Sequence, residues 1–251
     1  MVSFRLEVIG LENIPEVVFG DNIASLIIEA CQKGCVSLTG GDILVVAHKV
    51  VSKAEGRIVH LNGIKPSPFA RTIAQQTGKD PRAVEVILGE SRRIVRMARG
   101  ILVVETHQGF ISANGGVDSS NVGPGVVALL PKDPDASAEK IRRELQERIG
   151  VPLAVIISDS FGRPWREGTI DVAIGVAGLG PLIDYRGQKD SYGYEMKASL
   201  IAVADELAGA GELVLGKTRQ VPVALVRGFL SSGTEGKGGQ LIRSPETDIF
   251  R

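Results

Sequence analysis

The order of the predicted elements indicates an α+β protein with mixed, largely antiparallel sheets and flanking helices. Predicted strands occur in clusters separated by helices, whereas a parallel α/β sheet would require a strict alternation of strand and helix. Hydrophobic residues make up 43% of the chain, which is enough for a substantial core. Since no repeat of fixed period and no low-complexity linker interrupts residues 1–251, we expect one module, within which two structural subdomains with soft boundaries could form.

The first part of the chain is predicted to form a strand, a helix and two further strands. Apolar and polar side chains alternate over residues 2–9, which is the pattern of a half-buried strand. A helix is expected from an Asp21 cap to Gly34, because the apolar side chains between them recur at helical spacing. Residues 42–47 (DILVVA) form a short buried strand, and we expect residues 57–61 (RIVHL) to pair with it.

The middle of the chain continues this mixture of helices and strands. Two short helices, each with a polar cap before a proline at the first helical position, are expected over residues 67–78 and 80–91. Three strands should follow, of which the last two are joined as a hairpin through Gln108 and Gly109: residues 93–97, 100–106 and 109–114.

The last part of the chain is predicted to add more buried strands and two helices. A strand is expected over residues 126–131, and a charged amphipathic helix over residues 137–150. The apolar residues 151–158 form a strand that should end at Asp159, where a polar loop opens. Beyond this loop we expect a long helix, a buried strand and an irregular tail: residues 194–215, 221–228 and 238–251.

The composition argues against several classes of function. Lys and Arg together number 29, as do Asp and Glu, so bulk electrostatics does not favour a nucleic-acid partner. Aromatic residues make up only 4%, which argues against a base-stacking surface. The N-terminal segment does not resemble a secretory leader, and no apolar run reaches the roughly 18 residues of a membrane-spanning helix. We therefore expect a cytoplasmic protein without a nucleic-acid or membrane partner.

Two polar segments carry the clearest candidate site residues. In ANGGVDSSNVGPG and IISDSFGRPWREG, an aspartate is followed directly by a serine: Asp118 with Ser119, and Asp159 with Ser160. Carboxylates and hydroxyls are hard oxygen ligands that suit Mg²⁺ or Mn²⁺, whereas the three scattered histidines do not make a zinc set. The alternative is that these Asp-Ser pairs simply cap turns.

A basic segment follows the predicted strand 42–47. Its cations Lys49, Lys53 and Arg57 could neutralise the oxygens of a phosphoryl group in transfer. The alternative is a solvated basic edge on a connecting segment. His48 could act as a general base, but a lone histidine at a strand end is more often a hydrogen-bonded structural residue.

The segment GELVLGKT, residues 211–218, matches the phosphate-binding P-loop consensus in its letters. A P-loop follows a strand and opens a helix, whereas here a helix is predicted before the segment and a strand after it. We therefore do not expect a true P-loop. A phosphate contact by Lys217 in another geometry stays open.

Several long segments resemble one known family. They are GDILVVAHKVVSKAEGRIV, GGVDSSNVGPG, LPKDPDASAEKIRREL, IISDSFGRPWREG, IGVAGL, DSYGYEM and VADELAGAGELVLGKTRQVPVALVRG. In this order, from about residue 5 to the C-terminus, they resemble the coenzyme F420-0:L-glutamate ligase family, also called gamma-glutamyl ligases. The resemblance implies the unusual α+β fold of that family and an intertwined homodimer.

The resemblance also implies an activity. It predicts a ligase that adds L-glutamate to the lactyl phosphate-linked carboxylate of a deazaflavin coenzyme precursor, through an acyl phosphate, with cleavage of GTP to GDP and phosphate. It further implies Mg²⁺ or Mn²⁺ at two divalent sites, together with K⁺. Some bacterial relatives carry a fused nitroreductase-like domain, which we do not expect here.

The resemblance assigns roles to individual residues. Lys53, Asp118 and Asp159 are the expected catalytic residues, and a divalent metal is expected at Asp118 and Asp159, with Ser160 as a ligand to the second ion. The GTP contacts that it implies are Ile14, Pro15, Glu16, Val17, His48, Lys49, Lys53, Asn121, Leu215, Gly216, Lys217, Thr218, Arg219, Gln220, Val221 and Pro222.

Two positions depart from the pattern of the family. His48 stands where many relatives have a small hydroxyl residue. Lys217 lies in a loop in which some relatives offer a carboxylate to the second cation, and an ammonium group cannot ligate a metal.

Two other hypotheses stay open at this point. The protein could be a nucleotide- and metal-dependent amide ligase with a different carboxylate acceptor. It could also be a non-catalytic GTP-binding protein.

Overall fold

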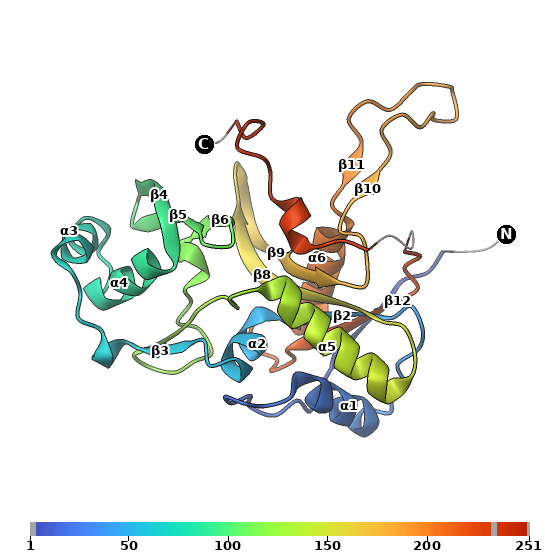
Figure 1. The fold of residues 1–251 in the computed structure, drawn as a ribbon, viewed down its shortest axis with the longest axis horizontal. Helices are drawn as coiled ribbons and strands as arrows, with labels where there is room; N and C mark the ends of the chain where they lie inside the picture. Colours follow the sequence, from blue (N-terminus) through green and yellow to red (C-terminus); the bar gives the residue numbers. More distant parts are fainter. Residues whose placement is uncertain (1–3, 232–234, 250–251) are drawn as a thin grey trace.

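The computed structural model describes residues 4–231 and 235–249 of the chain (Figure 1). Within these residues it is an α+β structure with several sheets, mostly antiparallel, and six α-helices. The predicted fold class is therefore confirmed. No helix in the described part of the chain combines the length and the apolar character needed to cross a membrane.

A five-stranded sheet forms the centre of the molecule, with strand order β1-β12-β2-β8-β9. Its strands are β1 (Glu7–Leu11), β2 (Ile43–Ala47), β8 (Ala154–Arg163), β9 (Arg166–Ala177) and β12 (Val223–Arg227). Strands β2 and β8 are parallel, and all other neighbours in this sheet are antiparallel. The last strand of the chain, β12, thus lies between the first two.

Helices cover both faces of the central sheet. The alternation of side chains along β2 sends Leu44 and Val46 into a core with α1 (Ile23–Lys33) and α5 (Pro134–Ile149). Ile43 and Val45 face the other way, into a core with α6 (Val203–Leu215), which lies behind the sheet in Figure 1. The centre of the molecule is therefore a three-layer sandwich whose sheet is buried on both faces.

A smaller lobe lies beside this sandwich (Figure 1). It packs two helices and a three-stranded sheet around its own apolar core: α3 (Pro68–Thr77), α4 (Pro81–Gly89), β4 (Ser91–Ala98), β5 (Ile101–Thr106) and β6 (Ile111–Ala113). The connections between lobe and sandwich include the antiparallel pair β3 (Ile58–His60) and β7 (Val126–Ala128). The remaining helical segments are α2 (His48–Ala54) and the 3₁₀ turns η1 (Leu61–Gly63), η2 (Asn114–Gly116) and η3 (Gly238–Leu241).

Local sequence signals explain several of these elements. Ser67 and Asp80 cap α3 and α4, each with a proline in the first turn, as predicted. The β5–β6 hairpin also forms as predicted. Helix α1 is capped by Asn22, whose side-chain oxygen accepts the Ser25 amide, rather than by the expected Asp21.

One predicted strand pairing and the predicted bounds of one strand near the N-terminus are wrong. Residues 57–61 do not pair with β2, because both edges of β2 are taken by β12 and β8, and β3 pairs with β7 instead. Strand β1 spans Glu7–Leu11 rather than residues 2–9, because its partner β12 reaches only these residues. The first two residues of the predicted strand, 2 and 3, lie outside the described residues.

Two further differences concern the C-terminal half. The polar loop predicted after Asp159 is wrong: β8 continues to Arg163 and returns as β9, a long hairpin that extends beyond the sheet. The predicted helix over residues 194–215 begins only at Val203. Before it, the chain forms a projecting arm closed by β10 (Ile183–Asp184) and β11 (Leu200–Ile201), visible at the upper right of Figure 1.

Candidate functional site

A cavity of about 840 Å³ opens where β2 ends and α2 begins. Since β2 and β8 run parallel, their carboxyl ends meet at the same edge, where open sheets commonly bind ligands. Segments far apart in the sequence converge here: the loop after β1, the start of α2, the loop after η2, the middle of the β8–β9 hairpin and the loop after α6. The residues predicted for the site line this cavity, except Arg57, Ser119 and Arg219.

The two predicted metal-binding aspartates are held by consecutive residues of α2. Asp159 Oδ1 lies 3.2 Å from Nε2 of His48, and Asp118 Oδ2 lies 2.6 Å from Nζ of Lys49. Neighbouring residues of one helical turn therefore each lie beside one of two carboxylates that are 41 positions apart in the sequence, and both carboxylates line the cavity. This juxtaposition is the geometric centre of the candidate site.

Asp118 is held in place by its backbone and by two side chains. Its amide and carbonyl pair with Ala128 in an isolated bridge, and its carboxylate accepts hydrogen bonds from the amide and the hydroxyl of Ser120 at 2.7 and 2.9 Å. Burial of the carboxylate would raise its pKa, but the hydrogen bonds from Lys49 and Ser120 outweigh burial and lower the pKa. Asp118 is therefore kept ionised, as a metal ligand must be.

His48 is a buried residue whose two ring nitrogens have different hydrogen-bonding surroundings. Its side chain is 3% exposed, and Nδ1 lies 3.4 Å from Oγ of Ser52, which itself donates a hydrogen bond to the carbonyl of Leu129 at 2.6 Å. Nε2 is close to Asp159 but misses hydrogen-bond geometry, so it is a buried polar atom without a hydrogen-bond partner in the described structure. The imidazole therefore has a structural anchor on one side and an open edge toward the cavity.

The cations of the predicted basic segment differ in what they contact. Lys53 is largely buried, with its side chain 12% exposed, and its ammonium lies 2.5 Å from Oε1 of Glu16 in the loop after β1. Arg57 does not line the cavity: it donates to the carbonyl of Leu130 at 2.9 Å and to Glu90 at 2.5 Å. Arg57 thus joins the lobe to the sandwich, whereas Lys49 and Lys53 face the site.

Two acidic residues of the site were not predicted from the sequence. Asp171 of β9 is buried and accepts hydrogen bonds from the hydroxyls of Ser158 and Ser160 at 3.0 and 2.6 Å. Its amide donates to Glu212 of α6 at 3.0 Å, and both residues line the cavity. A lone carboxylate within the apolar run TIDVAIGVA was a usable signal, because a buried charge requires partners.

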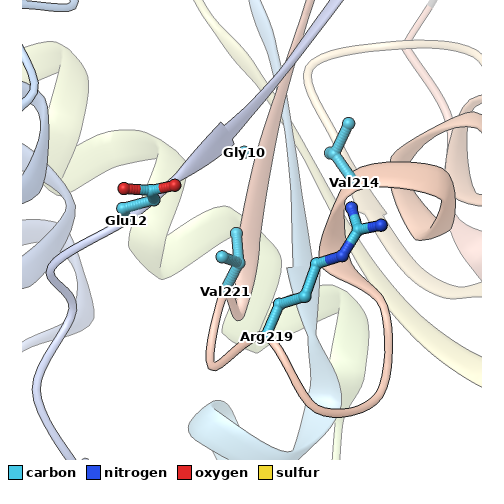
Figure 2. A pocket seen from close by; sticks show the side chains of 5 residues that line it. All are labelled: Gly10, Glu12, Val214, Arg219 and Val221. Carbon is cyan, nitrogen blue, oxygen red and sulfur yellow. The ribbon is translucent and has the colours of Figure 1, made fainter.

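The loop over residues 215–222 does not have P-loop geometry. It follows helix α6 and leads into strand β12, in agreement with the sequence-based interpretation. Its Arg219 turns away from the cavity and lines a separate hollow of about 420 Å³ with Gly10, Glu12, Val214 and Val221 (Figure 2). The rest of the loop lines the main cavity, and Val221 borders both.

Asp118 and Asp159 suit a divalent ion whose remaining ligands come from a bound substrate and water. No group of three or more His, Cys, Asp or Glu side chains within residues 4–231 and 235–249 could hold a metal by itself. Mg²⁺ commonly binds through one or two carboxylates, with substrate phosphates and water as the other ligands. Two ionisable carboxylates in one cavity match that pattern, whereas the chain alone does not provide a closed metal cage.

Comparisons with known proteins identify the family of the chain. The family model described as F420-0:Gamma-glutamyl ligase matches residues 12–228. The chain is 51% identical to a Coenzyme F420:L-glutamate ligase of Methanothermobacter thermautotrophicus, over 98% of this chain and 99% of the relative. Proteins of the same name from Methanopyrus kandleri and Methanocaldococcus jannaschii are 46% and 43% identical, over 99% and 98% of this chain and 98% and 97% of the relatives. The chain therefore belongs to the F420-0:gamma-glutamyl ligase family.

Proposed function

We propose that this protein is a GTP-dependent ligase that forms an amide bond between L-glutamate and the deazaflavin coenzyme F420-0 precursor. The observation that carries the proposal is the convergence of Asp118, Asp159 and Lys53 on one cavity, in a chain that matches the family model over most of its length. Relatives at 40–51% identity carry the name Coenzyme F420:L-glutamate ligase. The acceptor and the glutamate substrate are proposed from that name.

The proposed reaction has two steps. A carboxylate oxygen of the acceptor attacks the γ-phosphorus of GTP, the bond from phosphorus to the bridging oxygen breaks, and GDP leaves. The resulting acyl phosphate is then attacked at its carbonyl carbon by the amine of L-glutamate, which loses a proton as phosphate leaves. Both steps bring anionic groups together, so positioning and positive charge are the main contributions that the chain must supply.

The side chains of the cavity suit these tasks. Lys53, held against Glu16, can turn its ammonium toward the phosphoryl oxygens and stabilise the charge that develops there. Asp118 and Asp159 would hold Mg²⁺ or Mn²⁺, which when bound screens the charge of the phosphates. Lys49 keeps Asp118 ionised before the nucleotide arrives. The loop over residues 215–222, apart from Arg219, and the segment 14–17 both line the cavity and would contact the nucleotide.

Two parts of the proposal rest on the family resemblance. K⁺ is expected as a monovalent cofactor, without an assigned site. A homodimer is expected as well, and the projecting arm, with Tyr192 96% and Tyr194 63% exposed, offers apolar surface that a second copy could cover. Light scattering of the purified protein would give the oligomeric state.

The decisive experiment is a product assay. The protein is incubated with GTP, L-glutamate, Mn²⁺ and the F420-0 precursor, and GDP and the glutamylated product are measured by chromatography and mass spectrometry. We expect both products in equal amounts. GDP and phosphate without the glutamylated product would show hydrolysis of GTP by water and contradict the F420-0 precursor as acceptor. GTP binding without turnover would point to a non-catalytic GTP-binding protein.

A variant at the metal-binding position sharpens this assay. Asp159→Asn should lower turnover by roughly 10²- to 10³-fold, because removal of a single charge-stabilising group from an active site has effects of this size. The folded state should persist, as judged by the thermal transition. Glu147→Gln, on the exposed face of α5, is the matched control and should leave turnover unchanged. An Asp159→Asn variant with normal turnover would contradict the proposed role.

A further inference from the structure

We propose that the ammonium group of Lys217 takes the place of a second divalent ion. Each chain would then bind a single divalent ion, held by Asp118 and Asp159 together. This inference rests on the proposed function, since it concerns the same cavity. It departs from the two divalent sites that the family resemblance implies. Four side chains on the side of the cavity formed by β8, β9 and α6 carry it: Ser160, Asp171, Glu212 and Lys217.

Lys217 lies among the oxygen atoms that a second ion would need. Its ammonium donates a hydrogen bond to the hydroxyl of Ser160, the residue expected to ligate that ion. The same nitrogen lies 3.4 Å from Oε1 of Glu212 and 3.8 Å from Oδ1 of Asp171. One positive charge therefore already sits between two carboxylates and a hydroxyl, contributed by three different elements.

The side-chain oxygens of Ser160 and Asp171 on this side already take part in hydrogen bonds with neighbouring protein groups. The hydroxyl of Ser160 donates to Oδ1 of Asp171 at 2.6 Å and accepts from Lys217, while Oδ2 of Asp171 accepts from Ser158 at 3.0 Å. A divalent ion requires ligand oxygens at about 2.0–2.6 Å and would have to displace both the ammonium and these hydrogen bonds. The residues present therefore do not fit a second divalent ion.

The opposite side of the cavity differs in this respect. Asp159 accepts a hydrogen bond from the amide of Ser160 at Oδ1, and in the described structure no hydrogen bond reaches its Oδ2. Asp118 faces the same cavity, where its carboxylate accepts hydrogen bonds from Ser120 and pairs with Lys49. A divalent ion thus has one open carboxylate oxygen, Oδ2 of Asp159, whereas the ammonium of Lys217 already lies beside Ser160, Asp171 and Glu212.

An ammonium in this position would act on the same phosphates as a second ion. Lys217 belongs to the loop proposed to contact the nucleotide, and with its side chain 61% exposed it can reach toward bound phosphate oxygens. It would supply one positive charge that chelators cannot remove. Turnover should then depend on the concentration of a single divalent ion.

Counting bound ions tests the inference without any turnover. The protein is saturated with GDP, and the Mn²⁺ bound per chain is measured by equilibrium dialysis with electron paramagnetic resonance of the free ion. We expect one ion per chain in the unmodified protein. Lys217→Glu, which adds a carboxylate beside Asp171 and Glu212, should bind two. Lys217→Gln, which removes only the charge, serves as a second variant should the first fail to fold.

The control is Lys197→Glu, the same change of charge on the projecting arm, and it should still bind one ion. Two ions per chain in the unmodified protein would overturn the inference and leave the proposed ligase intact. One ion in both folded Lys217 variants would overturn it as well, since Lys217 would then not be what excludes the second ion. No bound ion in any protein would contradict both the inference and the metal-dependent function.

Discussion

The two ends of strand β2 each place an aspartate beside a cation, but the two pairs have different surroundings. At the amino end, Asp42 is 1% exposed and accepts hydrogen bonds from Nε and Nη2 of Arg227 at 2.8 and 2.6 Å, as well as from the amide of Thr39. At the carboxyl end, Asp118 pairs with Lys49, and its side chain is 40% exposed to a cavity.

The difference shows how one sheet separates stability from function. The fork of Arg227 satisfies both oxygens of Asp42, and this pair ties β12 to the start of β2 with no room for a ligand. The carboxylates at the other end face a cavity, and His48 keeps a buried nitrogen without a hydrogen-bond partner in the described structure. Changes at the first end should therefore affect folding, and changes at the second end should affect binding and turnover.

The largest effect on stability is expected at the amino end. Asp42→Ala removes the acceptor of two hydrogen bonds from Arg227 and of one from the Thr39 amide, which should cost about 1–3 kcal/mol, because the Arg227 side chain is 33% exposed and can be hydrated. Urea unfolding followed by circular dichroism would measure the loss. Asp118→Ala is the matched change at the other end of β2 and should cost less than about 1 kcal/mol, because its pair with Lys49 is partly exposed. Equal losses in the two variants would remove the distinction between the two ends.

The next effect concerns nucleotide binding. Lys53→Met keeps the aliphatic part of a largely buried side chain but removes its charge. If Lys53 contacts the phosphates, GTP affinity should fall by about 10- to 100-fold, or roughly 1.4–2.8 kcal/mol. Isothermal titration calorimetry would measure the change. Lys65→Met, at an exposed position of the lobe, is the control and should bind GTP normally.

The smallest effect concerns a carboxylate that has no cation beside it. Asp205 of α6 accepts the amide of Ala173 at 2.9 Å, and burial raises its pKa, although that hydrogen bond acts in the opposite direction. Folding therefore favours its protonated form, and its contribution to stability is lost as the pH rises from the unfolded value of about 4 through the higher folded value.

Asp205→Asn removes this titration while the amide oxygen can still accept the Ala173 hydrogen bond. The variant should gain unfolding free energy relative to the unmodified protein as the pH rises above about 4, by less than about 1 kcal/mol. Urea unfolding between pH 3 and 7 would show the divergence. Glu206→Gln, the exposed neighbour in the same turn, should show no such divergence.

Much of the fold could be predicted because its signals are local. The apolar run of β2, the capped helices α3 and α4 and the β5–β6 hairpin carry the periodicity or turn residues that define such elements. The β8–β9 hairpin was missed because the residues between Asp159 and Ile170 extend beyond the sheet and are largely exposed. Without one buried face, the alternation that marks a strand is absent.

The candidate site shows the same division. Lys53, Asp118 and Asp159 were candidates from their basic and polar segments, the family resemblance assigned their roles, and all three line one cavity in the structure. Asp171 and Glu212 were missed because their place in the site depends on β9 lying beside β8 and on the end of α6 lying against β9. The apolar run around Asp171 indicates that this carboxylate needs partners, but which residues provide them is set by tertiary packing.

The position of β12 has a consequence for how the molecule is made. During synthesis, β1 and β2 emerge early, yet the strand that separates them is formed by Val223–Arg227, close to the end of the chain. Until these residues leave the ribosome, one edge of β2 stays open to unwanted pairing. The mouth of the cavity, bordered by Pro222 just before β12, can take its final shape only then. Ligand binding at this cavity therefore cannot assist the early stages of folding, and a chain cut short before β12 should lack the proposed nucleotide site.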